Sequence, residues 1–504
     1  MQRWLILTFL LLPTLALAAS RTVGPGDNLN NAASQLRPGD TLTLRDGTYQ
    51  GNYLKILCTQ GFANGTAQAP ITVKAEHERM AFLKGDGSAL ELQVEQCAYW
   101  VFDGLRTEDG DFQGAGYGGM PDYGGYNVLV RDSDHITIRR FLTRYNNRYV
   151  NSHLFFLERT HNSLVEENEM YSYHRHGFVH GVGSNNTYRR NYANSRGYAD
   201  IPGGYGSAVS SQKGDSGFII YSGAPNTNTL YENNISEGND NNFWLQAHYA
   251  VIEGTRFLGN IALAGCYGFF QEPGDSANGE NRNTRFENDV AVDPACIGFG
   301  ISGTKSADVH NLTALNAGAG AGNGLVVGAC SGQGCGGGQY SVTSQNILSL
   351  SGANKGIRIE SGIQSWKVAS ANSFNNPTNY DPGDSGNYTN KRSQDAGLGA
   401  CKVWIPTTSP MHGAGEGGAD IGANVLYRYQ DGQLTQAPLW DPSSGRFPCG
   451  AVVSGVNDNE GDSCIGVHKR LNVNTNGCGF PQGYGAGGPG PLPTPTHLRV
   501  LGSQ

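Results

Sequence analysis

The stretch HITIRRFLTRYNN (135–147) returns in the same phase as NSLVEENEMYSYH (162–174), NNTYRRNYANSRG (185–197) and TNTLYENNISEGN (227–239). Weaker copies follow as NTRFENDVAVDPA (283–295) and ADVHNLTALNAGA (307–319). One asparagine recurs at a single phase, as Asn168, Asn191, Asn234, Asn260, Asn288, Asn311 and Asn346. A repeat of this kind, with insertions between copies, indicates a solenoid, because each unit is too short to bury its own apolar face.

The repeats favour strands over helices. Each holds apolar runs of a few residues broken by Asn and Gly, and none carries a long stripe with helical spacing. In a stack of parallel strands about 4.8 Å apart, identical side chains lie above one another. The asparagines then form a ladder at a buried corner. The sequence therefore predicts an all-β protein, a right-handed parallel β-helix solenoid.

The chain divides into four segments. Residues 1–18, MQRWLILTFLLLPTLALA, are typical of a cleavable signal peptide, so we expect a secreted or periplasmic protein. Residues 19–423 form the predicted β-helix domain, which opens with a segment that caps its first coil. Residues 424–480 form a predicted cysteine-containing C-terminal appendage tied by disulfides, and 481–504 a Pro/Gly-rich tail.

Composition narrows the class of protein. The 10 cysteines favour disulfides over zinc, since no CxxC pair occurs, and we expect cysteines that are neighbours in sequence to pair. The 73 glycines and a charged fraction of 15% indicate turn-rich β structure rather than disorder. A net charge of −8 argues against nucleic acid as a partner. After residue 18 the sequence holds no run long enough to cross a membrane, and we expect a monomer.

Two passages resemble a known family. APITVKAEHERMAFLKGDGSALELQV (69–94) with YWVFDGL (99–105) is similar to the opening coils of the chondroitinase-B and alginate lyase type of secreted β-helix. SPMHGAGEGGADIGA (Ser409–Ala423) resembles the last coil of many such proteins. The resemblance implies a polysaccharide lyase in which a Lys and Arg pair acts together with calcium-binding carboxylates. Arg175, in HRHG, is the nearest counterpart of that Arg, whereas GVGS (181–184) offers no Lys.

Aligned repeats place three polar columns where the chain leaves the apolar core for a turn. The columns are Asn146, Tyr173, Arg196 and Asn239; then Asn147, His174, Gly197 and Asp240; then Arg148, Arg175, Tyr198 and Asn241. His176 and Trp244 follow closely. Such a groove suits an acidic polysaccharide, because guanidinium groups bind carboxylates in a bidentate manner and sugar rings stack on aromatic faces.

The chemistry that this groove suits best is β-elimination of a uronic acid residue. Stabilising the developing enolate is the largest requirement, and Arg148 and Arg175 are the candidates for it. His174 or His176 is the predicted base, and Tyr173 or Tyr198 the predicted acid. The predicted substrate-binding residues are Arg148, Asn147, Arg196, Asp240, Asn241 and Trp244.

Three further interpretations stay open. Glu166, Glu167 and Glu169 are candidate calcium ligands, although alternate strand residues point opposite ways. A glycoside hydrolase would use two carboxylates among Asp200, Asp215, Glu237 and Asp240. A non-catalytic carbohydrate-binding or adhesive β-helix is the third possibility.

Overall fold

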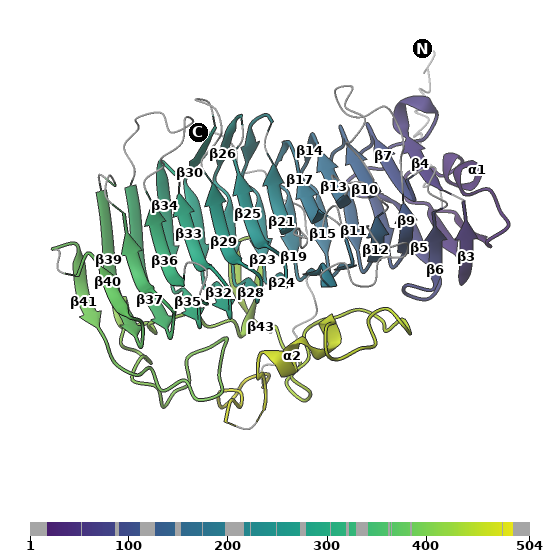
Figure 1. The fold of residues 1–504 in the computed structure, drawn as a ribbon. Helices are drawn as coiled ribbons and strands as arrows, with labels where there is room; N and C mark the ends of the chain where they lie inside the picture. Colours follow the sequence, from purple (N-terminus) through teal and green to yellow (C-terminus); the bar gives the residue numbers. More distant parts are fainter. Residues whose placement is uncertain are drawn as a thin grey trace, which may run out of the picture.

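The repeated units fold into short strands that stack coil upon coil along one axis (Figure 1). The structure is a computed structural model that describes residues 18–51, 53–85, 90–110, 126–146, 153–173, 175–196, 216–221, 223–247, 249–272, 279–302, 304–318, 322–328, 341–360, 363, 365–383, 386–475 and 477–486. Among these residues every pairing between solenoid strands is parallel. The fold is the predicted right-handed parallel β-helix, with the hand that parallel crossovers almost always take.

In the described part of the chain the solenoid has three sheets, here named A, B and C, which contain 24, 12 and 5 strands. Each central coil contributes one strand to sheet B, one to sheet C and two to sheet A, so sheet A has two arms that meet at a corner. The first arm consists of β1 (Ser20–Val23), β2 (Thr41–Leu44), β5 (Ile71–Ala75), β8 (Trp100–Asp103), β11 (Thr137–Arg139), β15 (Leu164–Glu166), β19 (Thr187–Arg189), β23 (Leu230–Glu232), β27 (Arg256–Leu258), β31 (Thr284–Glu287), β34 (Ser306–His310), β37 (Ser341–Leu350), β39 (Ser365–Phe374) and β41 (Tyr388–Arg392). The second arm consists of β3 (Gly47–Gln50), β6 (Ala81–Lys84), β9 (Arg106–Gly110), β12 (Leu142–Asn146), β16 (Glu169–Tyr171), β20 (Tyr192–Asn194), β24 (Ile235–Glu237), β28 (Ile261–Leu263), β32 (Val290–Val292) and β35 (Thr313–Leu315).

Sheet B forms the face that carries the candidate site. Its strands are β4 (Leu54–Leu57), β7 (Leu92–Glu95), β10 (Tyr126–Arg131), β13 (His153–Glu158), β17 (His176–His180), β21 (Ser216–Tyr221), β25 (Asn241–Gln246), β29 (Tyr267–Glu272), β33 (Ile297–Ser302), β36 (Asn323–Gly328), β38 (Lys355–Ile359) and β40 (Thr378–Asp381). Sheet C is shorter and consists of β14 (Thr160–His161), β18 (Gly183–Ser184), β22 (Asn226–Thr227), β26 (Val251–Glu253) and β30 (Glu280–Arg282).

Identical side chains stack inside the solenoid at the spacing of the coils. On sheet B the ring centroids are 4.7 Å apart from Phe178 to Phe218, 5.0 Å from Phe218 to Phe243 and 4.7 Å from Phe243 to Phe269. These distances match the separation of neighbouring strands, about 4.8 Å. The repeat therefore sets the register of the core, because a slip of one residue would turn every ring out of it.

The predicted asparagine ladder forms at the corner between the two arms of sheet A. Asn191 Oδ1 accepts hydrogen bonds from the backbone and side-chain nitrogens of Asn168, at 3.0 and 2.9 Å. Asn234 and Asn260 continue the column in the same way. The next member is Asp289, whose Oδ1 accepts from the backbone and side chain of Asn260.

The predicted ladder is one residue out of phase beyond Asn260. Asn288, Asn311 and Asn346 occupy the preceding position, where φ lies between 52° and 58°. Asparagine tolerates this left-handed backbone better than most residues, so the same residue type suits two adjacent positions of the corner.

The N-terminal cap is the short helix α1 (Leu29–Ser34). The side chain of Asn28 caps it by accepting from the backbone N–H of Asn31 at 2.8 Å. Leu29 and Ala33 are buried in the core cluster, so the helix covers the end of the apolar stack. A 3-10 helix, η1 (Cys58–Gln60), follows β4.

Residues 393–486, here named the C-terminal segment, leave the last strand and run back along the outside of the solenoid (Figure 1). They contain η5 (Glu416–Gly418), the antiparallel pair β42 (Tyr427–Gln430) and β43 (Gln433–Pro438), η6 (Cys464–Gly466) and α2 (Val467–Arg470). Ser409–Ala423, which resembles a last coil in sequence, forms turns and η5 within this segment. Among the described residues no helix is long and apolar enough to span a membrane.

Four disulfides lie in the described part of the chain, where no cysteine is free. Cys58–Cys97 and Cys266–Cys296 each join neighbouring cysteines, as predicted. In the C-terminal segment the expected pairing of neighbours is wrong for Cys401, which pairs with Cys478 and encloses the bridge Cys449–Cys464. Cys330 and Cys335 lie outside the described residues. The appendage is tied by its own disulfides, as the cysteine count indicated.

Candidate functional site

The outer face of the second arm of sheet A is covered by the C-terminal segment. The strands of this arm, continued by the end of β37 that pairs with β35, present an apolar column to the outside. The column consists of Leu142, Tyr171, Tyr192, Ile235, Ile261, Leu263, Val290, Val292, Leu315 and Leu348. These side chains share one buried cluster with Trp404, Val425 and Trp440 of the segment. The segment therefore closes this face by hydrophobic burial.

Buried polar groups hold the C-terminal segment in register on the solenoid. The side chain of Arg79, which is 0% exposed, forms an ion pair with Glu169 and donates to the carbonyl oxygen of Ala451 at 3.0 Å. Asn457 Nδ2 donates to the Glu169 carboxylate at 3.2 Å. Arg470 forms an ion pair with Glu237 at 2.6 Å. Because these charges are paired and hydrogen-bonded, their burial is tolerated.

The outer face of sheet B carries a row of aromatic rings across successive coils. From β10 to β13 the Tyr126 and His153 rings are 5.5 Å apart, and Tyr126 stacks on Phe156 at 5.4 Å. His153 stacks on His176 at 4.9 Å, and the edge of His176 meets Trp244 at 6.3 Å. Four strand steps separate β10 from β25, so the row extends over roughly 19 Å.

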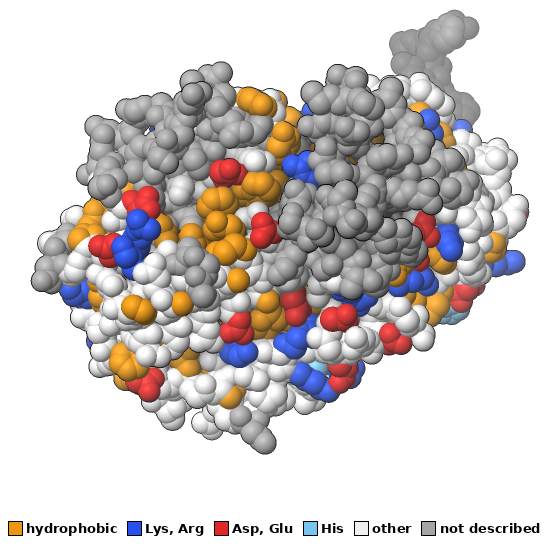
Figure 2. Space-filling model, viewed as in Figure 1, with side chains coloured by type: hydrophobic (Ala, Val, Ile, Leu, Met, Phe, Trp, Pro, Cys, Tyr) orange, Lys and Arg blue, Asp and Glu red, His pale blue; other side chains and the backbone are white. Residues whose placement is uncertain are grey.

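The same surface continues over β29. Tyr267 and Phe270 stack at 4.6 Å, and Phe270 follows Trp244 in the strand register. Figure 2, in the same view as Figure 1, shows apolar side chains gathered over the middle of sheet B beside acidic ones. His153 and His176 are buried within the row, whereas Tyr126, Phe156, Trp244, Tyr267 and Phe270 are partly exposed. Partly exposed aromatic rings are a surface on which sugar rings can stack.

The row is possible because of a local backbone feature. His176 and Ser216 are each followed by glycine, Gly177 and Gly217, and then by a core phenylalanine. A Cβ on Gly217 would lie 2.0 Å from Ser236 Oγ, so no larger residue fits there. The glycine lets the strand pack closely against sheet A while the residue before it joins the outer face.

His176 is the best-defined candidate for chemistry on this face. Its Nδ1 lies 2.7 Å from Ser216 Oγ, within hydrogen-bond distance. Its ring contacts the stacked ring of His153 and the ring of Trp244, which is inclined to it by 63°. Arg175 precedes it, and the Arg175 carbonyl accepts from the backbone N–H of Ser216 at 3.1 Å. The imidazole is therefore fixed by contacts from three strands.

Charges of both signs act on this face. Burial first, and then Arg175, lowers the pKa of His153 to about 3, so that ring stays neutral. Asp240 is exposed and precedes Asn241, the residue that pairs with Ser216. Trp244 Nε1 donates to Glu272 at 2.9 Å, and Gln246 donates to the same oxygen at 3.2 Å.

The acidic end of the row lies at β29. Burial raises the pKa of the Tyr267 phenol, and the charges of Asp240 and Glu272 raise it further. Arg175 and these two carboxylates therefore lie along one row of rings, with the cation toward β17 and the acids toward β25 and β29.

The structure brings together five of the predicted site residues on sheet B or at its edge. They are Arg175, His176, Asp240, Asn241 and Trp244. The predicted residues outside the described part of the chain are His174, Tyr198, Arg148 and Asn147, together with the candidate carboxylates Asp200 and Asp215.

Two predicted site residues lie elsewhere and need correction. Tyr173 is fully buried in the core cluster and donates to Asn239 Oδ1 at 2.5 Å, so its phenol cannot reach a polymer on the outer face. The Arg196 guanidinium lies 4.2 Å from the Tyr171 ring centroid and donates to the Val456 carbonyl at 2.7 Å. Arg196 therefore binds the C-terminal segment and does not lie on sheet B.

The predicted calcium ligands do not form one site. Glu169 is buried and paired with Arg79, whereas Glu166 and Glu167 are paired with Arg189 and Arg190. Burial acts to raise the pKa of the Glu166 carboxyl, but the two arginines together outweigh it and hold that pKa below its ordinary value. The alternation of the strand separates the carboxylates, and each already has an arginine partner.

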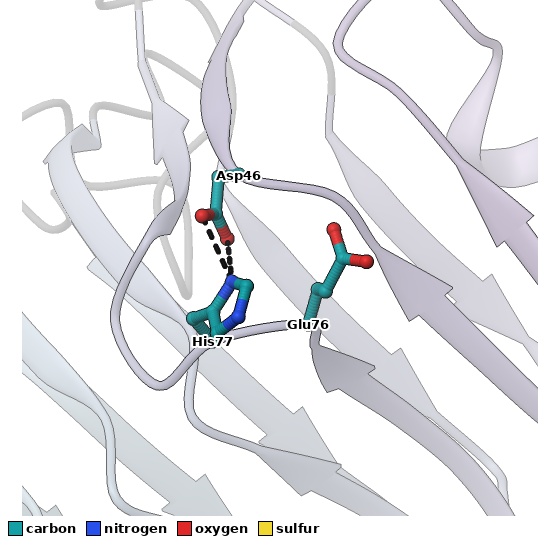
Figure 3. Close-up of side chains that lie close together, drawn as sticks. All are labelled: Asp46, Glu76 and His77. Carbon is teal, nitrogen blue, oxygen red and sulfur yellow. Dashed lines mark hydrogen bonds and ion pairs between the residues drawn. The ribbon is translucent and has the colours of Figure 1, made fainter.

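One group in the described chain has the composition of a small metal site. Asp46, Glu76 and His77 place three ligand atoms within 4.8 Å of one another on the N-terminal coils, and all three residues are exposed. His77 Nδ1 lies 2.9 Å from Asp46 Oδ2, and the interactions drawn in Figure 3 join only these two residues. Exposed clusters of this kind are common without an ion, so we assign no metal to it.

Sequence reasoning missed several residues of the row. His153, Ser216, Tyr267, Phe270 and Glu272 face the site from strands whose repeats were not aligned. Their signal was available as a glycine followed by phenylalanine, GF, which recurs at 177–178, 217–218, 268–269 and 298–299 and marks the register of sheet B.

Three comparisons with known proteins were made. Neither the scan against protein-family models nor the search of curated proteins finds a match. Among solved structures, the chain is similar to the pectate lyase Pel9A, with 15% identity, 81% of this chain and 96% of that chain covered, and a TM-score of 0.43. It is similar to a polygalacturonase from Erwinia carotovora with 10% identity, coverages of 72% and 96%, and a TM-score of 0.42. PfbA, a surface adhesin of Streptococcus pneumoniae, matches with 12% identity, coverages of 72% and 87%, and a TM-score of 0.44.

The parallel sheets and the four disulfides of the described residues define the class of protein, a disulfide-bonded parallel β-helix. The matched structures include a lyase, a polygalacturonase and an adhesin, so no activity follows from the matches themselves.

Proposed function

We propose that the protein is a secreted carbohydrate-active enzyme that cleaves a uronate-containing polysaccharide by β-elimination. The observation that carries this proposal is the row of rings on sheet B, with His176 and Arg175 in its path. A polymer lying across the strands would stack on Trp244 and pass the imidazole. The disulfides support an oxidising compartment.

Each described residue has a definite role in this proposal. The Arg175 guanidinium pairs with the sugar carboxylate, which lowers the cost of forming the enolate after proton removal. His176 takes the proton from the carbon beside that carboxylate, with Nε2 as the basic atom. Asn241 and Trp244 hold neighbouring sugars. Tyr198, outside the described residues, remains the predicted acid for the leaving oxygen.

A hydrolase is the second candidate, because two carboxylates lie near one phenol. Asp240 and Glu272 both act electrostatically on Tyr267, whereas Glu237 is removed from the pair because Arg470 binds it. Two carboxyl groups about 5.5 Å apart would retain configuration, and a separation of about 6.5–9.5 Å would invert it.

One experiment separates these functions. The purified protein is mixed with a panel of uronate polymers and neutral polymers, and ultraviolet absorbance of unsaturated ends is recorded together with reducing ends. Absorbance with a uronate polymer supports elimination. Reducing ends without absorbance would replace it with hydrolysis. If neither absorbance nor reducing ends increase but the protein still binds a polymer, it is an adhesive or binding protein.

A further inference from the structure

We propose that Ser216 and His153 are positioning residues for His176: Ser216 holds the proton on Nδ1, and His153 supports the ring face. This proposal deepens the proposed function, since it defines which atom of His176 is basic. Neither residue touches substrate in this scheme. Both act through the imidazole that they contact.

The contact with Ser216 permits two hydrogen-bond directions, and the proposal takes the one in which Nδ1–H of His176 donates to the hydroxyl oxygen. Ser216 is fully buried, and its Oγ lies 2.7 Å from His176 Nδ1. If Nδ1–H donates to this oxygen, the lone pair of the neutral ring is on Nε2, the atom that a base must present. The Ser216 backbone is fixed by its bond to the Arg175 carbonyl, so the hydroxyl and the residue before His176 are held together.

The stacked ring of His153 supports the same imidazole from the neighbouring coil. The two rings are 4.9 Å apart and inclined by 11°, and they pair in the strand register. His153 is 9% exposed, and its Nδ1 has no hydrogen-bond partner among the described residues, so its contribution is the face of the ring rather than a proton. Its pKa of about 3 keeps it neutral beside a ring that gains a proton. A neutral aromatic face stabilises a cation, whereas a second charge would repel it.

The groups that face this pair come from several elements. Among the described residues in contact, β17 is preceded by Arg175, β13 supplies His153, β21 supplies Ser216 and β25 supplies Trp244. Within that part of the chain, Arg175 is the cation that lowers the pKa of His153. Serine and tryptophan do not titrate near neutral pH, and His153 stays neutral there, so among these contacting groups a change in the pH profile on mutation reports on His176.

The first test is independent of turnover. Nitrogen-15 spectra of histidine-labelled protein, assigned with His176→Gln, report the tautomer of His176. We expect a protonated Nδ1 and an unprotonated Nε2 in the neutral ring, and a mixture of tautomers in Ser216→Ala. A protonated Nε2 in the wild-type protein would overturn the proposal, whether or not any polymer is cleaved.

The second test uses the polymer that gives activity. Ser216→Ala and His153→Ala should lower kcat by roughly 10-fold to 100-fold with KM nearly unchanged, because the base is misplaced while the sugars still bind. Ser216→Thr and His153→Phe should restore most of the loss, since they keep the hydroxyl and the stacked ring. Ser344→Ala is the matched control: it also removes a buried hydroxyl, from β37, and should leave kcat unchanged.

The two alanine variants also distinguish a role in positioning His176 from a role in the stability of the fold. If kcat falls only in proportion to the folded fraction measured by circular dichroism, or if His153→Phe is as slow as His153→Ala, the positioning role is refuted. A shifted acid limb in the pH profile of kcat/KM, together with an unchanged thermal midpoint, supports it.

Discussion

The second arm of sheet A and sheet B use the same repeat but meet different surroundings. The arm points Tyr171 and Tyr192 outward, and the C-terminal segment covers both. Sheet B places His176 and Trp244 in a row of rings, and neither belongs to the apolar cluster that the described residues of the segment form with the arm. Each face also carries arginine and carboxylate groups. Residue type alone therefore does not distinguish a binding face from a packing face.

What differs is the burial of the charges. On the arm, Arg79, Glu169 and Asn457 form a closed buried network. On sheet B, Asp240 is exposed and Glu272 is held by neutral donors from Trp244 and Gln246. Breaking a buried, fully hydrogen-bonded network costs more free energy than changing an exposed group. Four changes test this contrast.

The largest effect should come from opening the buried network. Glu169→Ala removes the buried carboxylate of Arg79 and leaves only the longer contact with Glu78, at 3.7 Å, which should cost about 3–5 kcal/mol in the free energy of unfolding. The measurement is chemical denaturation followed by tryptophan fluorescence. Asp132→Ala removes the partner of Arg159 in an exposed pair, 38% and 36% exposed, and is the control. It should cost at most about 1 kcal/mol. Equal losses in the two variants would contradict the contrast.

The next effect separates two arginines that the sequence grouped together. Arg175→Ala should lower turnover by about 10²–10³-fold, as removal of one enolate-stabilising donor does, with little change in thermal midpoint. Arg196→Ala should do the reverse, because its contacts are to Tyr171, Val456 and Asp462. Activity on the active polymer and the melting temperature are measured for both. A lowered melting temperature for Arg175→Ala with normal turnover would show that Arg175 is structural.

Removing a bridge of the C-terminal segment should loosen that segment alone. Cys449 and Cys464 are 15 residues apart, and a loop of that length contributes about 3 kcal/mol through chain entropy. In Cys449→Ser with Cys464→Ser, we expect faster hydrogen exchange in residues 449–464 and in the outer strands they cover. Protection in sheet B should be retained. Increased exchange throughout sheet B would show that the two faces are coupled.

The smallest effect concerns the last member of the asparagine ladder. Burial raises the pKa of Asp289 well above its ordinary value, against the hydrogen bonds from Asn260. A raised folded-state pKa contributes stability below the unfolded pKa of about 3.9, and this contribution is lost as pH rises. Asp289→Asn should remove that slope and gain about 1 kcal/mol at pH 7. The measurement is the free energy of unfolding of both proteins at pH 4 and pH 7. The same pH dependence in the variant and the wild-type protein would refute the role given to Asp289.

Much of the fold could be predicted from local pattern. The phase of Asn168, Asn191 and Asn234 identifies the corner, because stacking of coils repeats the same environment every turn. The prediction slips at Asn288, since asparagine suits both the ladder and the left-handed position before it. The disulfide Cys401–Cys478, which encloses the bridge Cys449–Cys464, could not be predicted from the sequence, because pairing depends on how the segment folds in space.

The candidate site was predictable only in part. Counting along the repeat placed Arg175, Asp240 and Asn241 near one another, as they lie at the same edge of sheet B. The same counting placed Tyr173 and Arg196 with them, although one side chain points into the core and the other under the C-terminal segment. A shift of one residue along a strand turns a side chain to the opposite face, and counting along the repeat does not resolve such a shift.

The sequence by itself determined the solenoid, its apolar core and the corner where its polar side chains turn outward. These depend on contacts between equivalent positions of adjacent coils, which a repeat encodes directly. Only the tertiary structure decided which outer face is covered. Residues 393–486 dock on strands that precede them in the chain by as many as about 300 residues, such as β16, and no local pattern carries that choice. The segment docks on the second arm of sheet A. The rings of His153, His176 and Trp244 lie in contact on the other face, sheet B.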